Sequence, residues 1–440
     1  MDKIAVFKNM NDAICASEIA WKEYTNHTMR DRERFIQTIR KTVLEPEILG
    51  ILARAAVEET AMGNYEHKLI KNRIAAEKSP GTEDLRTEAY SGDMGLTIEE
   101  FCAYGVIGAI APATNPSETI ICNSIAMLAG GNTVVFSPHP RAKRLSAWLI
   151  NLLNERLIAE GAPANLITTI EEPSIESTNE MTRHPKIAML VATGGPGIVK
   201  LVLSSGKKAI GAGAGNPPVV VDETADITKA ATDIINGSSF DNNLPCIAEK
   251  EVVAVASIAD ELIRAMEAGG AYVIKSMDQI EKLWRMVSTE NGGPHVGFVG
   301  KSAAYILEKT GISAARDVRI IIFETTADCK FVREEMMMPI LPIVRAANVD
   351  EAIELARIFE NGNRHTSVMH SKNVEKLTKM AKAMQTTIFV KNAPSYASFG
   401  VGGEGSASFT IAGPTGEGIT TARSFCRKRR CIMSDALHIR

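Results

Sequence analysis

Features that mark several classes of protein are missing from this sequence. Its 440 residues carry a formal net charge of −3, so there is no basic excess of the kind that nucleic-acid binding normally needs. No apolar run approaches the roughly 20 residues of a membrane span, and the N-terminus lacks the charged-then-apolar pattern of a signal peptide. We therefore expect a cytoplasmic globular protein of two or three structural units.

Cysteine is scarce and shows no pairing pattern. The seven cysteines are an odd number, and no two of them form a CxxC pair. Neither a zinc site nor a disulfide scaffold is indicated, so no metal is expected.

Short apolar runs alternate with helical stretches over most of the chain. Such runs, when rich in β-branched residues, are typical of a parallel sheet that is covered on both faces. The first unit has strand candidates at 104–112, 132–138, 187–192 and 217–222, with helices at 118–129, 142–160 and 197–205. The alternation then continues in a second unit, with strand candidates at 251–256, 318–324, 366–370 and 386–391.

Three segments lie outside this alternation. Apolar residues at helical spacing in 29–62 predict two helices separated at Pro46. Residues 85–103 predict a hairpin or arm with a turn near Gly92. The basic cluster at 427–430 is interpreted as a solvated tail or a subunit-contact strand, because four charges alone bind nucleic acid weakly.

Two glycine-rich stretches differ in their context. ATGGPG (192–197) follows a predicted strand and opens a predicted helix. That context suits a phosphate-binding turn, because backbone N–H groups can approach an anion at a helix N-terminus, but it equally suits an ordinary tight turn. GAGAGN (211–216) precedes a strand, so it is a poor phosphate loop.

Cys246 stands in an unusual context, because it follows Asn-Asn-Leu-Pro in a polar, turn-prone stretch. A buried cysteine is often only a small hydrophobic residue. A thiol becomes a nucleophile when nearby donors favour its thiolate. Composition alone leaves both interpretations open.

A resemblance to a known family decides between them. The motifs in order resemble the aldehyde dehydrogenase superfamily, from about Ile4 to the C-terminus. NNLPCIAEKEV and GPTGEGITTAR are more specific, and resemble its CoA-acylating branch, the acetaldehyde or propionaldehyde dehydrogenases often found in bacterial microcompartments. The motifs are ATNP (113–116), SPHPRA (137–142), ATGGPG, GAGAGNPPVVVD, NNLPC and EEMMMPILP (334–342).

The resemblance implies an α/β fold of aldehyde dehydrogenase type, with a Rossmann-type cofactor domain, an α/β catalytic domain and an oligomerisation arm. The expected boundaries are 1–88 and 108–218 for the NAD/CoA-binding domain, 219–400 for the catalytic domain, and 89–107 with 401–440 for the arm and C-terminal segment. A homodimer or homotetramer is implied, as are a cytoplasmic or microcompartment location and shell or cargo proteins as partners. Residues 1–27 lead directly into the first expected helices, so no separate targeting helix is expected there.

The resemblance also implies the chemistry. Cys246 would attack the aldehyde carbonyl, and the Asn115 side chain together with the backbone N–H of Cys246 would stabilise the resulting oxyanion. From the residues alone, Asn115 could equally be a turn residue before Pro116. Hydride would pass to NAD, and the acyl thioester on Cys246 would pass to coenzyme A.

Several matched positions would bind the cofactors. Thr193, Gly194 and Gly195 match the turn near the pyrophosphate, and Glu335 matches the carboxylate that holds the nicotinamide ribose. Gly213 lies among small residues that would leave room for the pantetheine arm. A further stretch takes the place of the adenine-ribose motif of hydrolytic relatives: Ser137, Pro138, His139 and Arg141, with Lys143 just beyond. Arg141 or Lys143 would meet the 3′-phosphate of CoA or the 2′-phosphate of NADP, or simply form a basic helix start.

One departure from the hydrolytic relatives favours CoA over water. Those enzymes use a glutamate as general base, and Ala212 stands at that position here. Alanine accepts no proton, so a thioester would wait for a thiol. Two alternatives stay open: a hydrolytic enzyme that takes its base from Glu404 or Glu417, and a non-catalytic scaffold subunit. His365 and His370 are expected to be structural, and the alternative left open is that one of them tunes thiol protonation near neutral pH.

Overall fold

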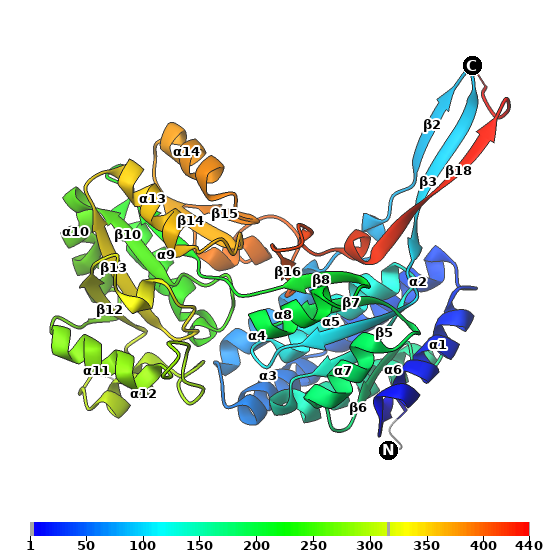
Figure 1. Cartoon of the computed structure of the whole chain (residues 1–440), viewed down its shortest axis with the longest axis horizontal. Coiled ribbons are helices and arrows are strands. Elements are labelled where there is room, and N and C mark those ends of the chain that lie inside the picture. Colours follow the sequence, from blue (N-terminus) through cyan, green and yellow to red (C-terminus); the bar gives the residue numbers. More distant parts are fainter. Residues whose placement is uncertain (1–3, 315–316, 440) are drawn as a thin grey trace. The chain divides into compact units, whose positions relative to one another are not determined.

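A computed structural model describes residues 4–314 and 317–439. The chain divides into two compact units, which are described separately (Figure 1). Unit 1 comprises Met1–Glu59, Leu69–Ala212 and Ser406–Arg440, and unit 2 comprises Thr60–Lys68 and Gly213–Gly405. The three-part division expected from the sequence, which sets the arm apart, stays a prediction. The strand candidate at 217–222, expected in the first unit, lies in unit 2, where it pairs with strands of the second sheet.

Unit 1 contains a six-stranded parallel sheet in the order β1-β6-β5-β4-β7-β8. β4 lies between β5 and β7, so the chain leaves β4 first to one side and later to the other. In open sheets of this kind, ligands bind outside the carboxyl ends of the strands where the direction reverses. The strands are β1 (Val6–Phe7), β4 (Val106–Ala111), β5 (Thr133–Pro138), β6 (Ile167–Ile170), β7 (Ile187–Thr193) and β8 (Lys208–Ala212).

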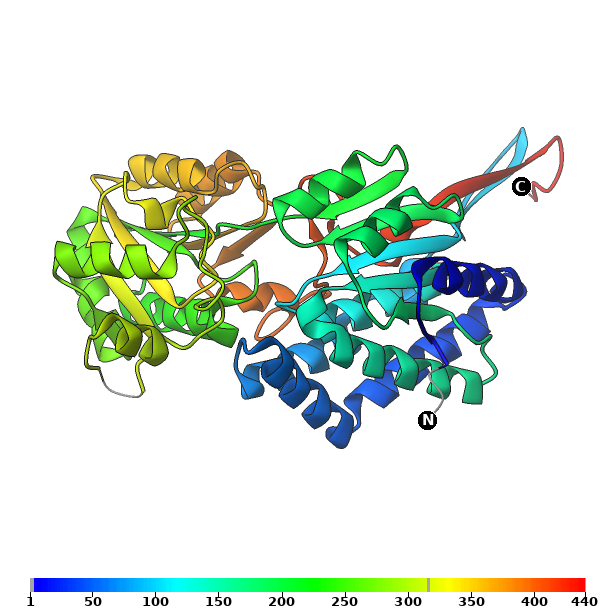
Figure 2. The same ribbon diagram turned by 60° about the horizontal axis from the view of Figure 1, so that its bottom comes forward.

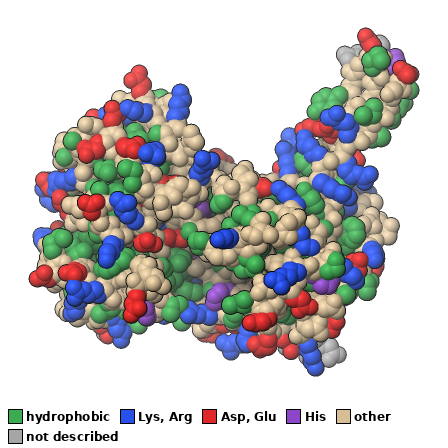
Figure 3. Space-filling model, in the orientation of Figure 1, with side chains coloured by type: hydrophobic (Ala, Val, Ile, Leu, Met, Phe, Trp, Pro, Cys, Tyr) green, Lys and Arg blue, Asp and Glu red, His purple; other side chains and the backbone are tan. Residues whose placement is uncertain are grey.

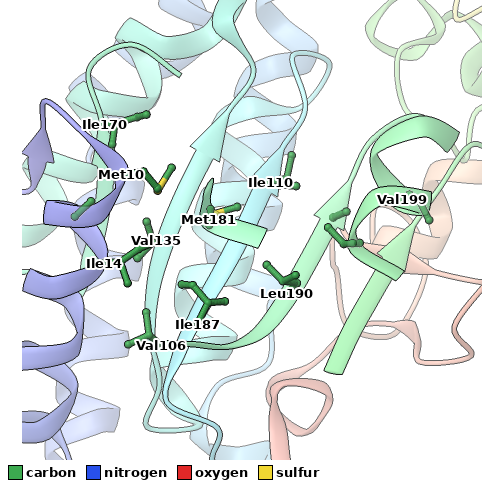
Figure 4. Close-up of a cluster of buried hydrophobic side chains, with 13 residues drawn as sticks. Met10, Ile14, Val106, Ile110, Val135, Ile170, Met181, Ile187, Leu190 and Val199 are labelled. Carbon is green, nitrogen blue, oxygen red and sulfur yellow. The ribbon is translucent and has the colours of Figure 1, made fainter. Parts of the chain in front are cut away.

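Helices cover this sheet on both faces, as predicted (Figure 2). One face packs on α1 (Met10–Tyr24), α7 (Ile175–Arg183) and α8 (Pro196–Leu203) through a buried apolar cluster (Figure 4). The cluster joins Ile14 of α1 and Met181 of α7 to strand residues such as Leu190. The other helices of the unit are α2 (Met29–Leu44), α3 (Pro46–Thr60), α4 (Tyr65–Lys78), α5 (Pro116–Ala129) and α6 (Lys143–Ala159), and the break predicted at Pro46 is confirmed.

Helix α5 is buried along its whole length, and it begins directly after Asn115. A buried ion pair anchors its first turn: Lys71 of α4 lies 3.1 Å from Glu118, and neither side chain is exposed to solvent. Breaking such a pair typically costs about 3–5 kcal/mol, because it leaves a buried charge without compensation. The position of Asn115 is therefore fixed by the core of unit 1.

Unit 2 contains a seven-stranded parallel sheet in the order β11-β12-β13-β10-β9-β14-β15. Alternate strand residues, among them Val220, Val253 and Val344, pack on α13 (Val349–Phe359) and α14 (Val374–Met384), while α9 (Ile227–Ser239) and α10 (Ala256–Ala268) pack together and contact other strands. The unit also has α11 (Met277–Val287) and α12 (Ala303–Thr310). The strands are β9 (Pro218–Val221), β10 (Glu251–Val255), β11 (Ala271–Val273), β12 (Ile320–Thr325), β13 (Ile340–Ala346), β14 (Thr366–His370) and β15 (Ile388–Lys391).

A three-stranded antiparallel sheet projects from unit 1 as an arm (Figure 1). β2 (Glu88–Gly92) and β3 (Gly95–Ala103) form the predicted hairpin, and β18 (Cys426–Ser434) pairs along the other edge of β3. The basic cluster lies in β18, where the side chains of Lys428 and Arg430 form ion pairs with carboxylates of β2 and β3. Lys and Arg side chains gather along the lower part of the arm (Figure 3).

Candidate active site

Three consecutive residues before Cys246 have left-handed backbone conformations. The φ angles are 49° at Asp241, 54° at Asn242 and 66° at Asn243. Most L-residues avoid this region, whereas Asp and Asn tolerate it because their short polar side chains can form local hydrogen bonds. Each such residue costs on the order of 1–3 kcal/mol, so the surrounding structure must hold the turn in place.

The side chains of the turn supply that support. Asp241 forms a fully buried ion pair with Lys68 at 3.0 Å. The amide of Asn242 donates to the Gly300 carbonyl at 2.9 Å. The amide of Asn243 donates to the carbonyls of Ser238 at 2.8 Å and Glu249 at 2.9 Å. The polar residues that looked out of place in the sequence are thus the ones that fix the backbone leading to Cys246.

A buried lysine completes the turn from the other side. Lys250 is 4% exposed, and its Nζ donates to Asn243 Oδ1 at 2.6 Å and to the Asn243 carbonyl at 3.0 Å. Burial lowers the pKa of Lys250, and the charges of Glu335 and then Cys246 act in the opposite direction. Cys246 itself is partly exposed, as a reactive thiol must be.

Gly215 lies against the cysteine turn and permits a very close approach. A Cβ at this position would lie 2.5 Å from the carbonyl oxygen of Cys246 and 2.9 Å from Cγ of His365. The backbone N–H of Gly215 also donates to the carboxylate of Glu335. Burial raises the pKa of Glu335, and Lys250 and this N–H partly offset the rise. Glycine at position 215 therefore brings Cys246, Glu335 and His365 into one cluster.

The members of this cluster share one edge of the unit 2 sheet. Cys246 precedes β10, Gly215 precedes β9, Glu335 precedes β13 and His365 precedes β14, and all four strands are parallel neighbours in the order β13-β10-β9-β14. Because the amino ends of parallel strands lie at the same edge, residues far apart in sequence meet there. Gly213 belongs to the segment that enters β9 at this edge.

His365, which the sequence leaves as a structural residue or one that tunes the thiol, lies in the cysteine cluster. Its side chain is buried, and burial, aided by the charge of Lys250, lowers its pKa to about 4. The imidazole is therefore neutral near pH 7, and its Nε2 has no hydrogen-bond partner among the described residues. His370 closes β14 at the opposite edge of the sheet, so it is not part of the cluster.

The remaining predicted site residues lie in unit 1, at the carboxyl edge of its sheet. Asn115 follows β4 and is the N-cap of α5, with its side-chain amide 3.2 Å from Thr114 Oγ1. Its own Oδ1 is buried without a hydrogen-bond partner in the described part of the chain. Ser137 and Pro138 end β5, and Thr193 ends β7. These are the carboxyl ends where a doubly wound sheet binds its ligands.

The turn after β7 leads into a helix N-terminus that no side chain caps. Gly195 is the N-cap of this helix, α8. A Cβ on Gly195 or Gly197 would meet no atom within 4 Å, so the backbone there stands beside open space. Gly194 N–H donates to the Ala212 carbonyl, and Thr193 Oγ1 lies 2.8 Å from Thr410 Oγ1. Unused N–H groups at a helix start attract anions.

The stretch after β5 uses some of its polar groups internally. The hydroxyl of Ser137 is buried and lies 2.8 Å from Thr178 Oγ1. Lys143 forms an ion pair with Glu172 at 2.5 Å. His139 Nδ1 accepts from the Arg141 N–H, and burial, then the Arg141 charge, lower the pKa of His139. Exposed Arg141 is therefore the better placed of the two cations to meet a phosphate.

The acids that could replace the missing base are poorly disposed for that role. Ala212 is buried at the end of β8. Glu417 pairs with Lys208 at 3.1 Å, and Glu404 is exposed. In the described ranges, no group of three or more His, Cys, Asp or Glu side chains is arranged to hold a metal ion. None of the described helices combines the length and apolar character that crossing a membrane requires.

Comparisons with known proteins place these features in context. The family described as "Aldehyde dehydrogenase family" matches residues 5–286 and 317–416. Propanal dehydrogenase (CoA-propanoylating) of Salmonella typhimurium is 48% identical, over 99% of this chain and 93% of its own. Propionaldehyde dehydrogenase of Rhodopseudomonas palustris, solved with bound CoA and an acylated cysteine, is 60% identical with a TM-score of 0.98, over 99% of each chain.

A further structure comes from a bacterial microcompartment. A propionaldehyde dehydrogenase from the fucose utilisation microcompartment of Clostridium phytofermentans is 53% identical, with a TM-score of 0.97 over 99% of this chain and 100% of its own. The predicted fold of aldehyde dehydrogenase type is thereby confirmed.

Substituting Gly215 by Ala should disable the site. The added Cβ would lie 2.5 Å from the Cys246 carbonyl oxygen, so the cysteine turn or His365 must shift. A displacement of about 1 Å typically costs roughly 100-fold in rate, so we expect a loss of that order in aldehyde-dependent NADH formation. Gly293→Ala is the matched control, since its Cβ would find its nearest neighbour at 3.8 Å. Equal rates for the two variants would contradict this placement of Gly215.

Glu249 should make stability depend on pH. Its buried carboxylate accepts from the N–H of Ser395 at 2.7 Å and from its hydroxyl at 2.8 Å, and burial raises its pKa from 4.5 to about 7. Because the folded state holds the Glu249 proton more tightly than the unfolded chain does, protonation of Glu249 stabilises the folded state. This stabilisation is complete below about pH 4.5 and is lost as the pH rises through about 7. The free energy of unfolding falls by at most about 3 kcal/mol over this pH range.

Glu249→Gln should therefore unfold at a higher temperature than the unsubstituted chain at about pH 8, and the difference should shrink toward about pH 5. Thermal unfolding followed across this range measures the effect. The exposed Glu267 of α10 supplies the control, as Glu267→Gln. A constant difference between Glu249→Gln and the unsubstituted chain at every pH would show that Glu249 does not take up the proton.

Proposed function

Because the chain belongs to the aldehyde dehydrogenase family, we propose that it is a CoA-acylating aldehyde dehydrogenase. It oxidises a short-chain aldehyde to the acyl-CoA with NAD⁺ and CoA, and the reaction is reversible. The buried Ala212 carries the conclusion that CoA, and not water, accepts the acyl group, because hydrolytic relatives have a general base at this position. The relative with bound CoA and an acylated cysteine supports the same choice.

Cys246 is the nucleophile. Its sulfur attacks the aldehyde carbon, and the carbonyl π electrons move to oxygen, which gives a thiohemiacetal. The amide of Asn115 and the N–H of Cys246 donate to this oxygen, a role typically worth about 3–4 kcal/mol of barrier. NAD⁺, when bound, accepts the hydride from the same carbon, and the product is a thioester on Cys246. The thiol of CoA would then lose its proton to solvent, and its sulfur would attack the thioester carbon, so that the electron pair of the broken C–S bond returns to Cys246 as the thiolate.

Residues of both units bind the cofactors in this proposal. The α8 N-terminus, with Thr193, Gly194 and Gly195, holds the pyrophosphate, because its N–H groups carry no side-chain cap. Glu335 holds the nicotinamide ribose. The side chain of Arg141 meets the phosphate on the adenine ribose of CoA, since Lys143 is occupied by Glu172. Ser137 shapes the pocket through its backbone, because its hydroxyl is used by Thr178.

The hydrolytic alternative needs a base that the described residues do not offer near Ala212. Glu417 forms an ion pair with Lys208, and the Glu404 side chain is exposed to solvent. The scaffold alternative fails to explain why the strained turn before Cys246 is supported by so many buried polar contacts.

The arm and the location of the enzyme complete the proposal. β2 and β18 each leave one edge of the arm sheet unpaired within the described chain, and Met94, Ile432 and Tyr90 are exposed by 78%, 64% and 55%. Unpaired edges that carry apolar side chains bind other chains readily. We propose that the arm joins subunits into a homodimer or homotetramer. The Clostridium phytofermentans relative comes from a microcompartment, which supports a place for this chain inside one. Shell or cargo proteins as its partners are part of the same proposal.

NADH formation from propanal should require both Cys246 and CoA. With CoA present, Cys246→Ala should reduce the rate to background, whereas Cys329→Ala, a partly exposed cysteine of the same unit, should keep it. Without CoA, the unsubstituted enzyme should form no more than about one NADH per site, because the thioester accumulates. A steady rate of NADH formation without CoA would favour hydrolysis instead.

Charge placed on the arm should dissociate the subunits. The double variant Met94→Asp/Ile432→Asp should sediment as a monomer, because two exposed apolar side chains at the arm become charged. Ile175→Asp is the control, since Ile175 of α7 is 76% exposed and lies outside the arm. Sedimentation velocity measures the oligomeric state of each variant. An unsubstituted chain that is already monomeric would refute the assembly role of the arm.

A further inference from the structure

A single positive charge is enclosed next to the nucleophile without a carboxylate in contact. The Lys250 ammonium has three hydrogen-bond acceptors, Asn243 Oδ1, the Asn243 carbonyl and the Pro245 carbonyl at 3.5 Å, and all of them are uncharged. No ion pair joins Lys250 to a carboxylate within the described ranges. A buried charge is costly unless another charge compensates it.

The flanking acids do not compensate this charge fully. Burial raises the pKa of Glu249 to about 7 and that of Glu251 well above its usual value. Neither carboxyl oxygen of Glu251 has a hydrogen-bond partner among the described residues, which suits a neutral acid and not a buried anion. His365 is neutral near pH 7 and adds no negative charge.

Two groups remain to balance the ammonium, and both belong to the site. Of the groups that favour the charged form of Lys250, Glu335 acts most strongly and Cys246 next. Cys246 can serve only as a thiolate, since a thiol carries no charge. The attraction acts in both directions. If the Cys246 thiolate stabilises the Lys250 ammonium, the ammonium stabilises the thiolate to the same extent.

We propose that Lys250 is the counter-ion of the Cys246 thiolate, and thus a positioning residue that acts through Cys246. This inference deepens the proposed function and rests on it for its catalytic meaning. It gives the lysine two parts in the reaction. The ammonium keeps the sulfur anionic before it attacks the aldehyde. It also favours the departing Cys246 thiolate when the CoA thiol takes over the acyl group, because an anion re-forms beside it.

A purely structural lysine would behave differently. If Lys250 served only to hold the Asn243 turn, glutamine could still donate to Asn243 Oδ1 and the chemistry of the thiol would stay the same. If it is the counter-ion, removal of the charge changes the pH at which Cys246 reacts. Arginine keeps the charge and should therefore keep this pH near that of the unsubstituted chain.

Alkylation of Cys246 by iodoacetamide tests the proposal without aldehyde, NAD⁺ or CoA. Mass spectrometry of the peptide that carries Cys246 gives its rate at each pH. In the unsubstituted chain, the half-maximal rate should be reached about one pH unit or more below the ~8.5 of an ordinary thiol. Lys250→Gln should raise this midpoint by about one unit or more and slow alkylation near pH 7 about tenfold. Lys250→Arg should restore the midpoint, and Lys275→Gln, at an exposed lysine of the same unit, should not move it.

Two results would overturn the proposal. One is a midpoint at or above the ordinary thiol value in the unsubstituted chain, which decides the matter even where Lys250→Gln does not fold. The other is a folded Lys250→Gln variant with an unchanged midpoint. Failure of the proposed function gives a different result. A low midpoint for alkylation of Cys246 in a chain without CoA-dependent turnover would support Lys250 as the counter-ion and would contradict only the acyl transfer to CoA.

Discussion

The left-handed turn at Asp241, Asn242 and Asn243 is the constraint on which the site depends. Its backbone is unfavourable for most residues, so it persists only because buried partners on both sides hold each side chain. The turn delivers Cys246 to a partly exposed position at the amino edge of the sheet, with Lys250 behind it. A nucleophile fixed in this way loses little entropy on reaching the geometry for attack.

The candidate site residues lie at the carboxyl edge of the sheet in unit 1 and at the amino edge of the sheet in unit 2. In unit 1 the candidate cofactor residues follow strands, at the carboxyl edge where doubly wound sheets bind ligands. In unit 2 the cysteine cluster precedes strands, at the amino edge. Ala212 and Gly213 form one of the four points at which the chain passes from one unit to the other, and neither side chain is a proton acceptor.

Much of this architecture is predictable from the sequence, because buried parallel strands leave long apolar runs and the hairpin has its own turn signal. Strands β1, β6, β8 and β11 are missed because they are short and leave too few apolar residues to stand out. The longer β13 is also missed, since Pro342 interrupts its apolar run. The family motifs identify Cys246 and the fold. They do not show that the consecutive charges Glu249, Lys250 and Glu251 are all buried, because such a run is normally a solvated surface. Contacts between distant segments, such as that of His365 with Gly215, also leave no local pattern.

The central claim is that an acyl group rests on Cys246 until a thiol removes it. Mass spectrometry of the enzyme after a single exposure to propanal and NAD⁺ tests this claim most directly. The account predicts a propanoyl group on the peptide that carries Cys246, stable in water and released as propanoyl-CoA when CoA is added. Free propanoate formed in step with NADH, with no acyl group on that peptide, would contradict it.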